Sequence, residues 1–138
     1  MKRLFCIGLL GLAAAGFRTA AGEPDAAMLK HGEYLVDAAC LCADCHTFRD
    51  WKGTLDRAHW LQGAKLDFKP TRITPWADHA PGIAGLPGFA TDDAAVAFFE
   101  TGLKAGKKCS TPMPQYRFSH DDARAIVAYL RSLPAAVK

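Results

Sequence analysis

The residues Cys42-Ala43-Asp44-Cys45-His46 are the most informative stretch of this sequence. Two cysteines three positions apart lie on the same side of a helical turn, so their thiols can add to the two vinyl groups at one edge of a haem. The adjacent histidine can then place its imidazole beneath the iron. Because C-x-x-C-H marks covalent attachment of a c-type haem, Cys42 and Cys45 are predicted to form thioethers and His46 to bind the iron.

Two other kinds of site can be built from similar residues. A thioredoxin-like redox pair needs a βαβ surround, whereas the sequence around the motif predicts a helix before it and a broken loop after it. A zinc site needs a second ligand pair at knuckle spacing, and Cys109 with His120 does not have that spacing. The surrounding sequence therefore favours haem attachment.

The N-terminal segment has the composition of a secretory signal peptide. Lys2 and Arg3 precede an uncharged apolar run over residues 4–17, followed by small residues suited to cleavage. The run is shorter than the roughly 20 residues of a membrane-spanning helix. We predict a cleaved leader at 1–21, a single domain at 22–138, and an exported, periplasmic protein without a membrane span after cleavage.

Removal of this leader changes the charge balance. The chain has 17 Lys and Arg against 14 Asp and Glu, and three of the basic residues but none of the acidic ones lie in the leader. The mature chain is then formally neutral, which argues against a nucleic-acid partner. Four of the five cysteines remain, an even number that suits an oxidising compartment.

The rest of the chain predicts an all-α domain of three to five short helices with long Gly/Pro-rich loops. Residues 27–39 have a helical apolar pattern and lead directly into the haem motif. Thr91 and Ser119 are predicted N-caps of two later helices, the second of which ends before Pro134. Residues 48–88 contain nine Gly or Pro, and so long a loop is reasonable where it wraps around one haem.

The second axial ligand of the iron is predicted to be Met113, which lies between Pro112 and Pro114. An ordinary methionine fills a core from a helix, whereas prolines on both sides fix this thioether in a loop. A thioether ligand raises the reduction potential of haem iron. Met28 lies on the helix that leads into the motif and approaches from the wrong side. The remaining histidines are expected at the surface: His31, His59, His79 and His120.

Four further segments carry a family resemblance: residues 32–36, 72–75, 112–114 and 125–133. They resemble the class I c-type cytochromes and, more closely, the mono-haem cytochrome c subunits of bacterial periplasmic dehydrogenases. The similarity covers nearly all of residues 28–134. It implies a cytochrome c-like fold in which the first and last helices cross, with Gly32 allowing close approach and Tyr34 meeting Tyr129 and Leu130.

The resemblance also implies two features around the haem. A proline carbonyl accepts a hydrogen bond from the iron-bound histidine in this family, and Pro70 or Pro75 could supply it here. Family members usually have Asn before Ile-Thr-Pro, where this chain has Arg72. The guanidinium of Arg72 is a candidate partner for a haem propionate, and the alternative is a solvated side chain.

The implied function is electron transfer by one covalent haem c, without enzymatic activity. Electrons would come from a periplasmic dehydrogenase and pass to a respiratory acceptor, either a cytochrome or an oxidase. One alternative is a haem enzyme or gas-binding sensor whose sixth ligand is displaceable, and another is a module that only docks a larger enzyme. Four basic residues near Met113 form either a docking surface or a solvated turn: Lys104, Lys107, Lys108 and Arg117.

Two cysteines are left over after the leader is removed and the haem takes its two thiols. An exported protein rarely keeps such a pair reduced, so Cys40 and Cys109 are predicted to form a disulfide. The bridge would tie the end of the first helix to the Met113 loop and requires Cα atoms within about 7 Å. Two free thiols are the alternative.

Overall fold

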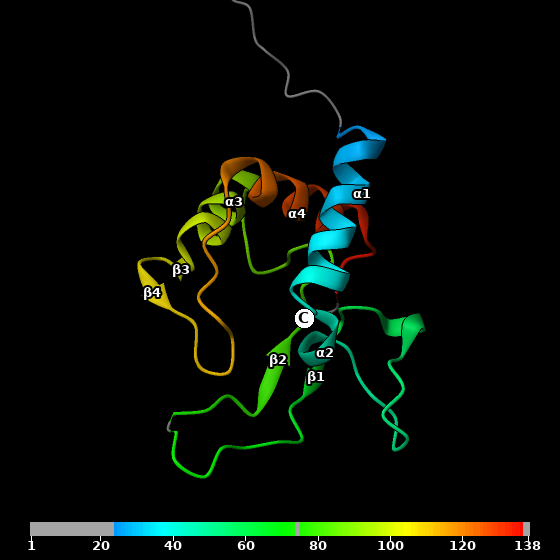
Figure 1. Ribbon diagram of the computed structural model, residues 1–138, viewed down its shortest axis with the longest axis vertical. Helices are drawn as coiled ribbons and strands as arrows, with labels where there is room; N and C mark the ends of the chain where they lie inside the picture. The colour runs from blue at the N-terminus through cyan, green and yellow to red at the C-terminus, as the bar shows by residue number, and fades with distance from the viewer. Residues whose placement is uncertain (1–23, 74, 137–138) are drawn as a thin grey trace, which may run out of the picture.

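The computed structural model describes residues 24–73 and 75–136, so the predicted leader at 1–21 lies outside the described residues (Figure 1). Helices α1, α3 and α4 lie in the upper half of Figure 1, whereas α2, most of the loops, and β1 and β2 lie in the lower half. The elements in chain order are α1 (Ala26–Tyr34), a π-helical turn (Leu35–Ala39), α2 (Ala43–His46), a 3-10 turn (Arg57–His59), β1 (Gly63–Lys65), β2 (His79–Pro81), α3 (Asp92–Thr101), β3 (Leu103–Lys104), β4 (Lys107–Lys108) and α4 (His120–Ser132).

The predicted all-α class is only partly met. The described residues form four α-helices, but two short antiparallel ribbons accompany them. In the first ribbon Gly63 pairs with Pro81 and Lys65 with His79. In the second, Leu103 pairs with Lys108. The first ribbon closes the base of the loop over residues 66–78, and the second is a hairpin with a two-residue turn. Strands of two or three residues are too short to produce an alternating pattern in the sequence.

The predicted crossing of the first and last helices is present, with Gly32 at the point of closest approach. A Cβ atom on Gly32 would lie 2.0 Å from the carbonyl oxygen of Ala125, so only glycine allows the backbones to come this near. Tyr34 does not enter the core as expected, since it is 60 % exposed. Leu35 and Val36, three and four positions after Gly32, lie on its side of the helix and are buried instead.

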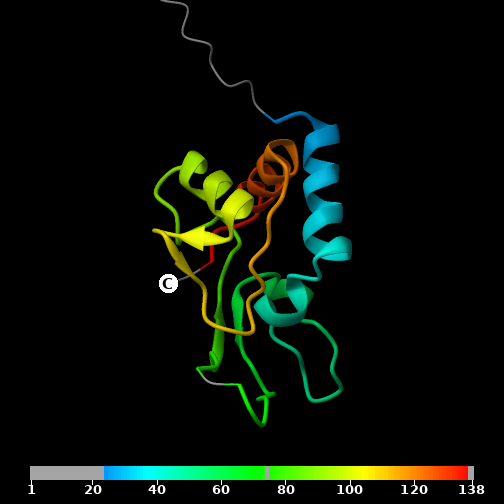
Figure 2. The ribbon, with the colours of Figure 1, turned by 60° about the vertical axis from the view of Figure 1, so that its left-hand side comes forward.

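Both predicted N-caps are confirmed. The Thr91 hydroxyl accepts from the amide of Ala94, and the Ser119 hydroxyl accepts from the amide of Asp122. The second cap sets the start of α4, whose buried face packs against α1 and α3 (Figure 2). None of the helices in the described part of the chain is long and apolar enough to cross a membrane.

Candidate functional site

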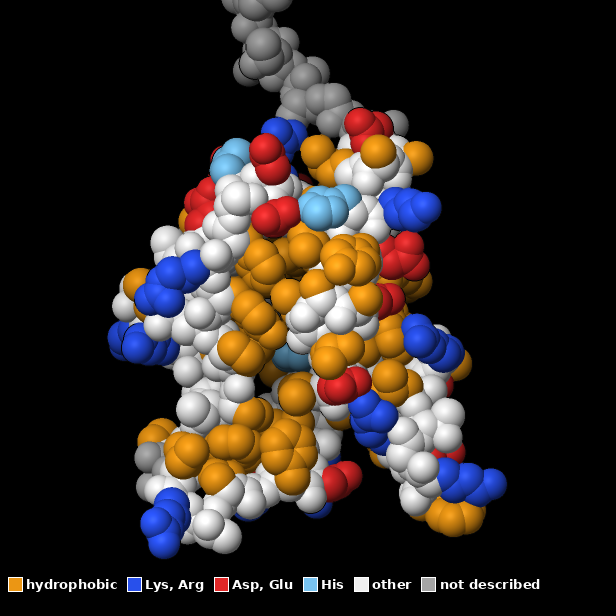
Figure 3. All heavy atoms as spheres, viewed as in Figure 1, with side chains coloured by type: hydrophobic (Ala, Val, Ile, Leu, Met, Phe, Trp, Pro, Cys, Tyr) orange, Lys and Arg blue, Asp and Glu red, His pale blue; other side chains and the backbone are white. Residues whose placement is uncertain are grey.

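A cavity of about 930 Å³ opens between α2, the segment after β2, α3 and the loop that leads to α4. Apolar side chains surround the hollow at the centre of the face shown in Figure 3. The residues predicted to bind the haem all line this one cavity: Cys42, Cys45, His46 and Met113. The structure therefore brings together residues that lie up to 71 positions apart in the sequence.

The haem motif forms a tight helical turn. Leu41 has a left-handed backbone, with φ of 52°, which ends the π-helical turn and redirects the chain into α2. The amide of Cys42 is bonded to the carbonyl oxygen of Val36 at 3.0 Å, and the amide of His46 to that of Cys42 at 2.9 Å. This turn presents both thiols and the imidazole to the same cavity.

His46 is the most tightly positioned of these side chains. It is 7 % exposed, and its Nδ1 lies 2.6 Å from the carbonyl oxygen of Pro81. A carbonyl oxygen can only accept, so Nδ1 carries the proton and Nε2 keeps its lone pair for a metal. Burial lowers the pKa of His46, which favours the neutral imidazole that metal binding requires.

The expectation that Pro70 or Pro75 supplies the carbonyl to His46 is wrong, because Pro81 does so. Pro70 and Pro75 lie in the loop beyond the β1–β2 ribbon, whereas Pro81 ends β2 at the side facing α2. The pairing of Gly63 with Pro81 fixes this position. Sequence reasoning missed Pro81 because the partner is a backbone atom placed by strand register.

The cysteines of the cavity favour the neutral thiol. Burial, with the nearby negative charges of Cys40 and Asp37, raises the pKa of the Cys42 thiol to about 12. Burial also raises the pKa values of Cys40 and Cys45. A thioredoxin-like pair needs a thiolate of lowered pKa, so these surroundings do not suit that alternative.

The zinc alternative also lacks support in the structure. Among the described residues, no three or more His, Cys, Asp or Glu side chains cluster closely enough to hold a metal ion. Three of the predicted surface histidines are exposed and bonded to carboxylates at 2.7 Å: His31, His59 and His120. His79 is exposed too, but it also lines the cavity.

Met113 is half-buried and lines the same cavity as the haem motif. Its loop is anchored by hydrogen bonds at the two residues Ser110 and Thr111, which precede Met113. The amide of Met113 is bonded to the carbonyl oxygen of Ser110 at 3.2 Å. The Thr111 hydroxyl donates to the carbonyl oxygen of Pro75, and the backbone carbonyl oxygen of Thr111 accepts from the amide of Ala77 at 2.7 Å. These contacts hold the Met113 loop at the cavity.

Three further predicted residues have different outcomes. Cys40 and Cys109 both line the cavity, and the structure has both as free thiols. Their bridge is therefore not shown and stays a prediction. Arg72 is exposed and does not line the cavity, so the structure does not bring it to the haem site.

Aromatic residues form a wall of the cavity that the sequence analysis did not identify. Phe98 and Phe99 of α3 are buried and stack edge to face, with ring centroids 5.1 Å apart. Tyr116 and Phe118 stack at 5.2 Å in the segment before α4. All four line the cavity. The available signal was the concentration of aromatic residues between positions 98 and 118.

The residues at this cavity fit a haem c. Two thiols lie on one helical turn, a neutral imidazole has its free nitrogen available, a thioether comes from a separate loop, and the remaining lining is apolar and aromatic. A flat apolar ring with a central metal requires this combination of covalent, coordinating and non-polar groups.

Comparison with known proteins also indicates a c-type cytochrome. No family model matches the chain. The chain is 32% identical over 114 residues to the fructose dehydrogenase cytochrome subunit of Gluconobacter japonicus, covering 75% of this chain and 22% of the relative. It is 28% identical over 122 residues to a diheme cytochrome c-type protein of Cereibacter sphaeroides, covering 77% and 36%.

These matches place the chain beside the c-type cytochromes, which it resembles in sequence and in the residues of its cavity. Within that class it resembles the cytochrome subunits of dehydrogenases, as its motifs predicted. The chain spans only about a fifth of one relative and about a third of the other.

Proposed function

We propose that this protein is an electron carrier with one haem c. Cys42 and Cys45 would form the two thioethers, and His46 and Met113 would be the axial ligands of the iron. The observation that carries the proposal is the bond from His46 Nδ1 to the Pro81 carbonyl oxygen, which aims a neutral imidazole into a cavity shared with both thiols and the thioether.

Each of these residues has a distinct task. The haem iron supplies a one-electron couple. The Pro81 carbonyl orients His46 and increases the basicity of its free nitrogen. Met113 favours the reduced iron and raises its potential. The aromatic and aliphatic lining keeps water from the haem ring and so also favours the reduced iron.

This ligand set favours electron transfer over catalysis. If His46 and Met113 both bind the iron, they would leave it no open position for a substrate or a gas. The names of both relatives describe cytochromes, which agrees with an electron carrier rather than an enzyme. The single C-x-x-C-H motif in this sequence supports one haem, although one relative is named as diheme.

We further propose that the donor is a periplasmic dehydrogenase and the acceptor another cytochrome or an oxidase. The support for the donor is the relative named as a cytochrome subunit of fructose dehydrogenase. The leader-like residues 1–21 support export to the periplasm. A docking surface is available on the β3–β4 ribbon, where Lys104, Lys107 and Lys108 are exposed and Lys104 also lines the cavity.

We also propose that Cys40 and Cys109 form a disulfide in the exported protein. Both thiols line the same cavity, one just before the haem motif and the other four residues before Met113. A bridge would tie the Met113 loop to the end of the π-helical turn. It would close a loop of about 70 residues and stabilise the fold by roughly 4 kcal/mol in the chain-entropy model.

The proposal is tested on the mature protein exported from a bacterium that matures c-type cytochromes. Its intact mass should exceed that of the polypeptide by one haem, and the haem should remain with the protein in acidified acetone. Cys42→Ala with Cys45→Ala should lose this attachment, whereas Cys109→Ala should keep it. Haem that extracts into acetone from the wild type would show that the attachment is wrong.

The axial ligands are tested separately by spectroscopy. The oxidised protein should show the weak near-infrared band of sulfur-to-iron charge transfer, and the reduced protein should not bind carbon monoxide readily. Met113→Ala should remove the band and allow carbon monoxide to bind, while Met28→Ala should change neither. Ready binding of carbon monoxide by the wild type would favour the gas-binding or enzymatic alternative.

A further inference from the structure

One wall of the cavity is an irregular segment that needs support from outside itself. This wall segment, residues 83–89, contributes five residues to the cavity lining: Ile83, Leu86, Pro87, Gly88 and Phe89. Its first three residues are anchored by backbone hydrogen bonds to Leu61, Leu130 and Ala136, whereas the amides of Leu86 and Phe89 bond only within the segment, to Ile83 and Leu86. Neither helix nor strand therefore fixes its path.

The backbone of the wall segment is also strained at one position. Leu86 has a left-handed φ of 52° although it is not glycine, and it is only 2 % exposed. Such a conformation persists only where surrounding contacts hold it. Gly85, with φ of 68°, precedes it and packs so closely on Ala135 that a Cβ would lie 2.6 Å from the Cα atom of that residue.

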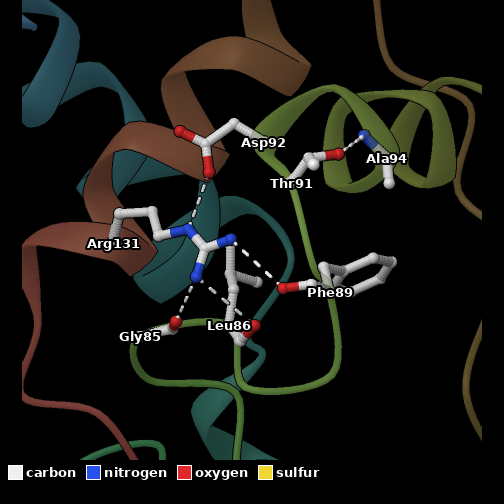
Figure 4. A network of polar contacts seen from close by, with 7 residues as sticks. All are labelled: Gly85, Leu86, Phe89, Thr91, Asp92, Ala94 and Arg131. Carbon is white, nitrogen blue, oxygen red and sulfur yellow. Dashed lines mark hydrogen bonds and ion pairs between the residues drawn. The ribbon is translucent and has the colours of Figure 1, made fainter.

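Arg131, near the end of α4, makes contacts that hold the wall segment from outside it (Figure 4). Its Nη1 donates to the carbonyl oxygen of Gly85 at 2.7 Å and lies 3.5 Å from that of Leu86. Its Nη2 donates to the carbonyl oxygen of Phe89 at 3.4 Å. Its Nε donates to the carboxylate of Asp92 at 2.7 Å, at the start of α3.

The planar fork of a guanidinium suits this arrangement, because several donors point outward in fixed directions from one group. With the carbonyl oxygens of the wall segment turned toward Arg131, the side chains of Leu86 and Phe89 are free to line the cavity. The ammonium of a lysine has no such fork and could keep the charge but not the set of contacts.

We propose that Arg131 is a positioning residue that holds the wall segment against the cavity and thereby sets the reduction potential of the bound haem. This inference rests on the proposed function. An intact wall keeps water away from the iron and favours the reduced form, which carries less charge. A loosened wall admits water, which stabilises the oxidised form.

The test uses the haem-bearing protein and four variants. Arg131→Gln removes both fork and charge, and Arg131→Lys removes the fork but keeps the charge. Asp92→Asn weakens only the contact to α3. Arg124→Gln is the matched control, since Arg124 is an exposed arginine two turns earlier on the same helix.

Two quantities are measured for each variant. The first is the reduction potential, where Arg131→Gln and Arg131→Lys should both shift the ratio of oxidised to reduced protein at least threefold toward oxidised, roughly 28 mV for a one-electron couple. The second is hydrogen exchange in peptides covering residues 83–90, which both Arg131 variants should accelerate at least tenfold. Arg124→Gln should change neither quantity, and Asp92→Asn should give a smaller shift than Arg131→Lys.

Several results would overturn the inference. A wild-type potential in Arg131→Lys, with a shift only in Arg131→Gln, would assign the effect to charge alone. An equal shift of the reduction potential in Asp92→Asn and Arg131→Lys would assign the effect to the contact between α3 and α4. Unchanged hydrogen exchange of the wall segment in both Arg131 variants would show that Arg131 does not hold this segment in place. Absence of covalent haem in the wild type is read beforehand from its mass, and that result refutes the proposed function and this inference together.

Discussion

Substitution of Gly32 by alanine should destabilise the protein, although alanine is the better helix former. The added Cβ would lie 2.0 Å from the Ala125 carbonyl oxygen, 2.7 Å from its carbonyl carbon and 2.8 Å from the Cβ of Tyr129. Two of these three atoms belong to the backbone of α4, so no side-chain rotation can relieve the overlap. Ordinary contact begins near 3.4 Å, and α1 must therefore move away from α4 by about 1.4 Å.

The expected magnitude follows from two opposing effects. Replacing glycine by alanine within a helix gains up to about 1 kcal/mol of helix propensity. Overpacking costs typically about 1–3 kcal/mol and more where backbone must shift. We expect the packing cost to exceed the gain, for a net loss of about 2 kcal/mol in the free energy of unfolding. In a domain of this size that loss lowers Tm by roughly 8 °C.

The assay is equilibrium unfolding of the haem-bearing protein in guanidinium chloride, followed by circular dichroism. Glu33→Ala is the matched control, because Glu33 is the next residue of the same helix and is exposed. That variant should stay within about 0.5 kcal/mol of the wild type. A Gly32→Ala protein as stable as the wild type, or more stable, would refute the close approach of the two backbones.

Three further predictions concern charge and covalent structure. Hydrogen bonds, first from His31 and then from Ser119, lower the pKa of Asp122 from its usual 3.8 in the folded protein. The ionised carboxylate therefore contributes to folding stability above pH 3.8, and this contribution is lost as the pH falls through the lower pKa of the folded state. Asp122→Asn should accordingly flatten the acid limb of the stability–pH curve. Charge reversal at Lys107 and Lys108 should slow association with an acidic redox partner and flatten its salt dependence, and an unchanged second-order rate would exclude the β3–β4 ribbon as the docking surface. The denatured oxidised protein should contain no titratable thiol, whereas two thiols would show that Cys40 and Cys109 stay unpaired.

The sequence predicted those features of the site whose causes are local. The spacing of Cys42, Cys45 and His46 is itself the geometry that covalent haem attachment would need, and the caps at Thr91 and Ser119 act within one helical turn. The crossing at Gly32 was also expected, because the resemblance to the class I c-type cytochromes implies it. Tyr34 was placed wrongly since it lies two positions from Gly32, on a different side of the helix.

Features set by distant backbone contacts could not be predicted in the same way. The partner of His46 is a carbonyl oxygen, which every residue has, and the register of the β1–β2 ribbon alone selects Pro81. The contacts of Arg131 are also to carbonyl oxygens, 42 to 46 positions earlier in the chain. The identity of the accepting residue carries little information in such contacts, so the sequence shows the donor but not its target.

The burial that shapes the cavity also determines which chemistry it can support. It lowers the pKa of His46 and raises that of Cys42 to about 12, so both groups are neutral at ordinary pH. Neutral imidazole is the form that coordinates iron, whereas a neutral thiol is a poor nucleophile toward disulfides. The same desolvation therefore favours a metal ligand and disfavours thiol-based redox catalysis. An apolar cavity that holds His46 and Met113 on separate elements is suited to changing the charge of a bound centre by one electron with little rearrangement of the surrounding groups.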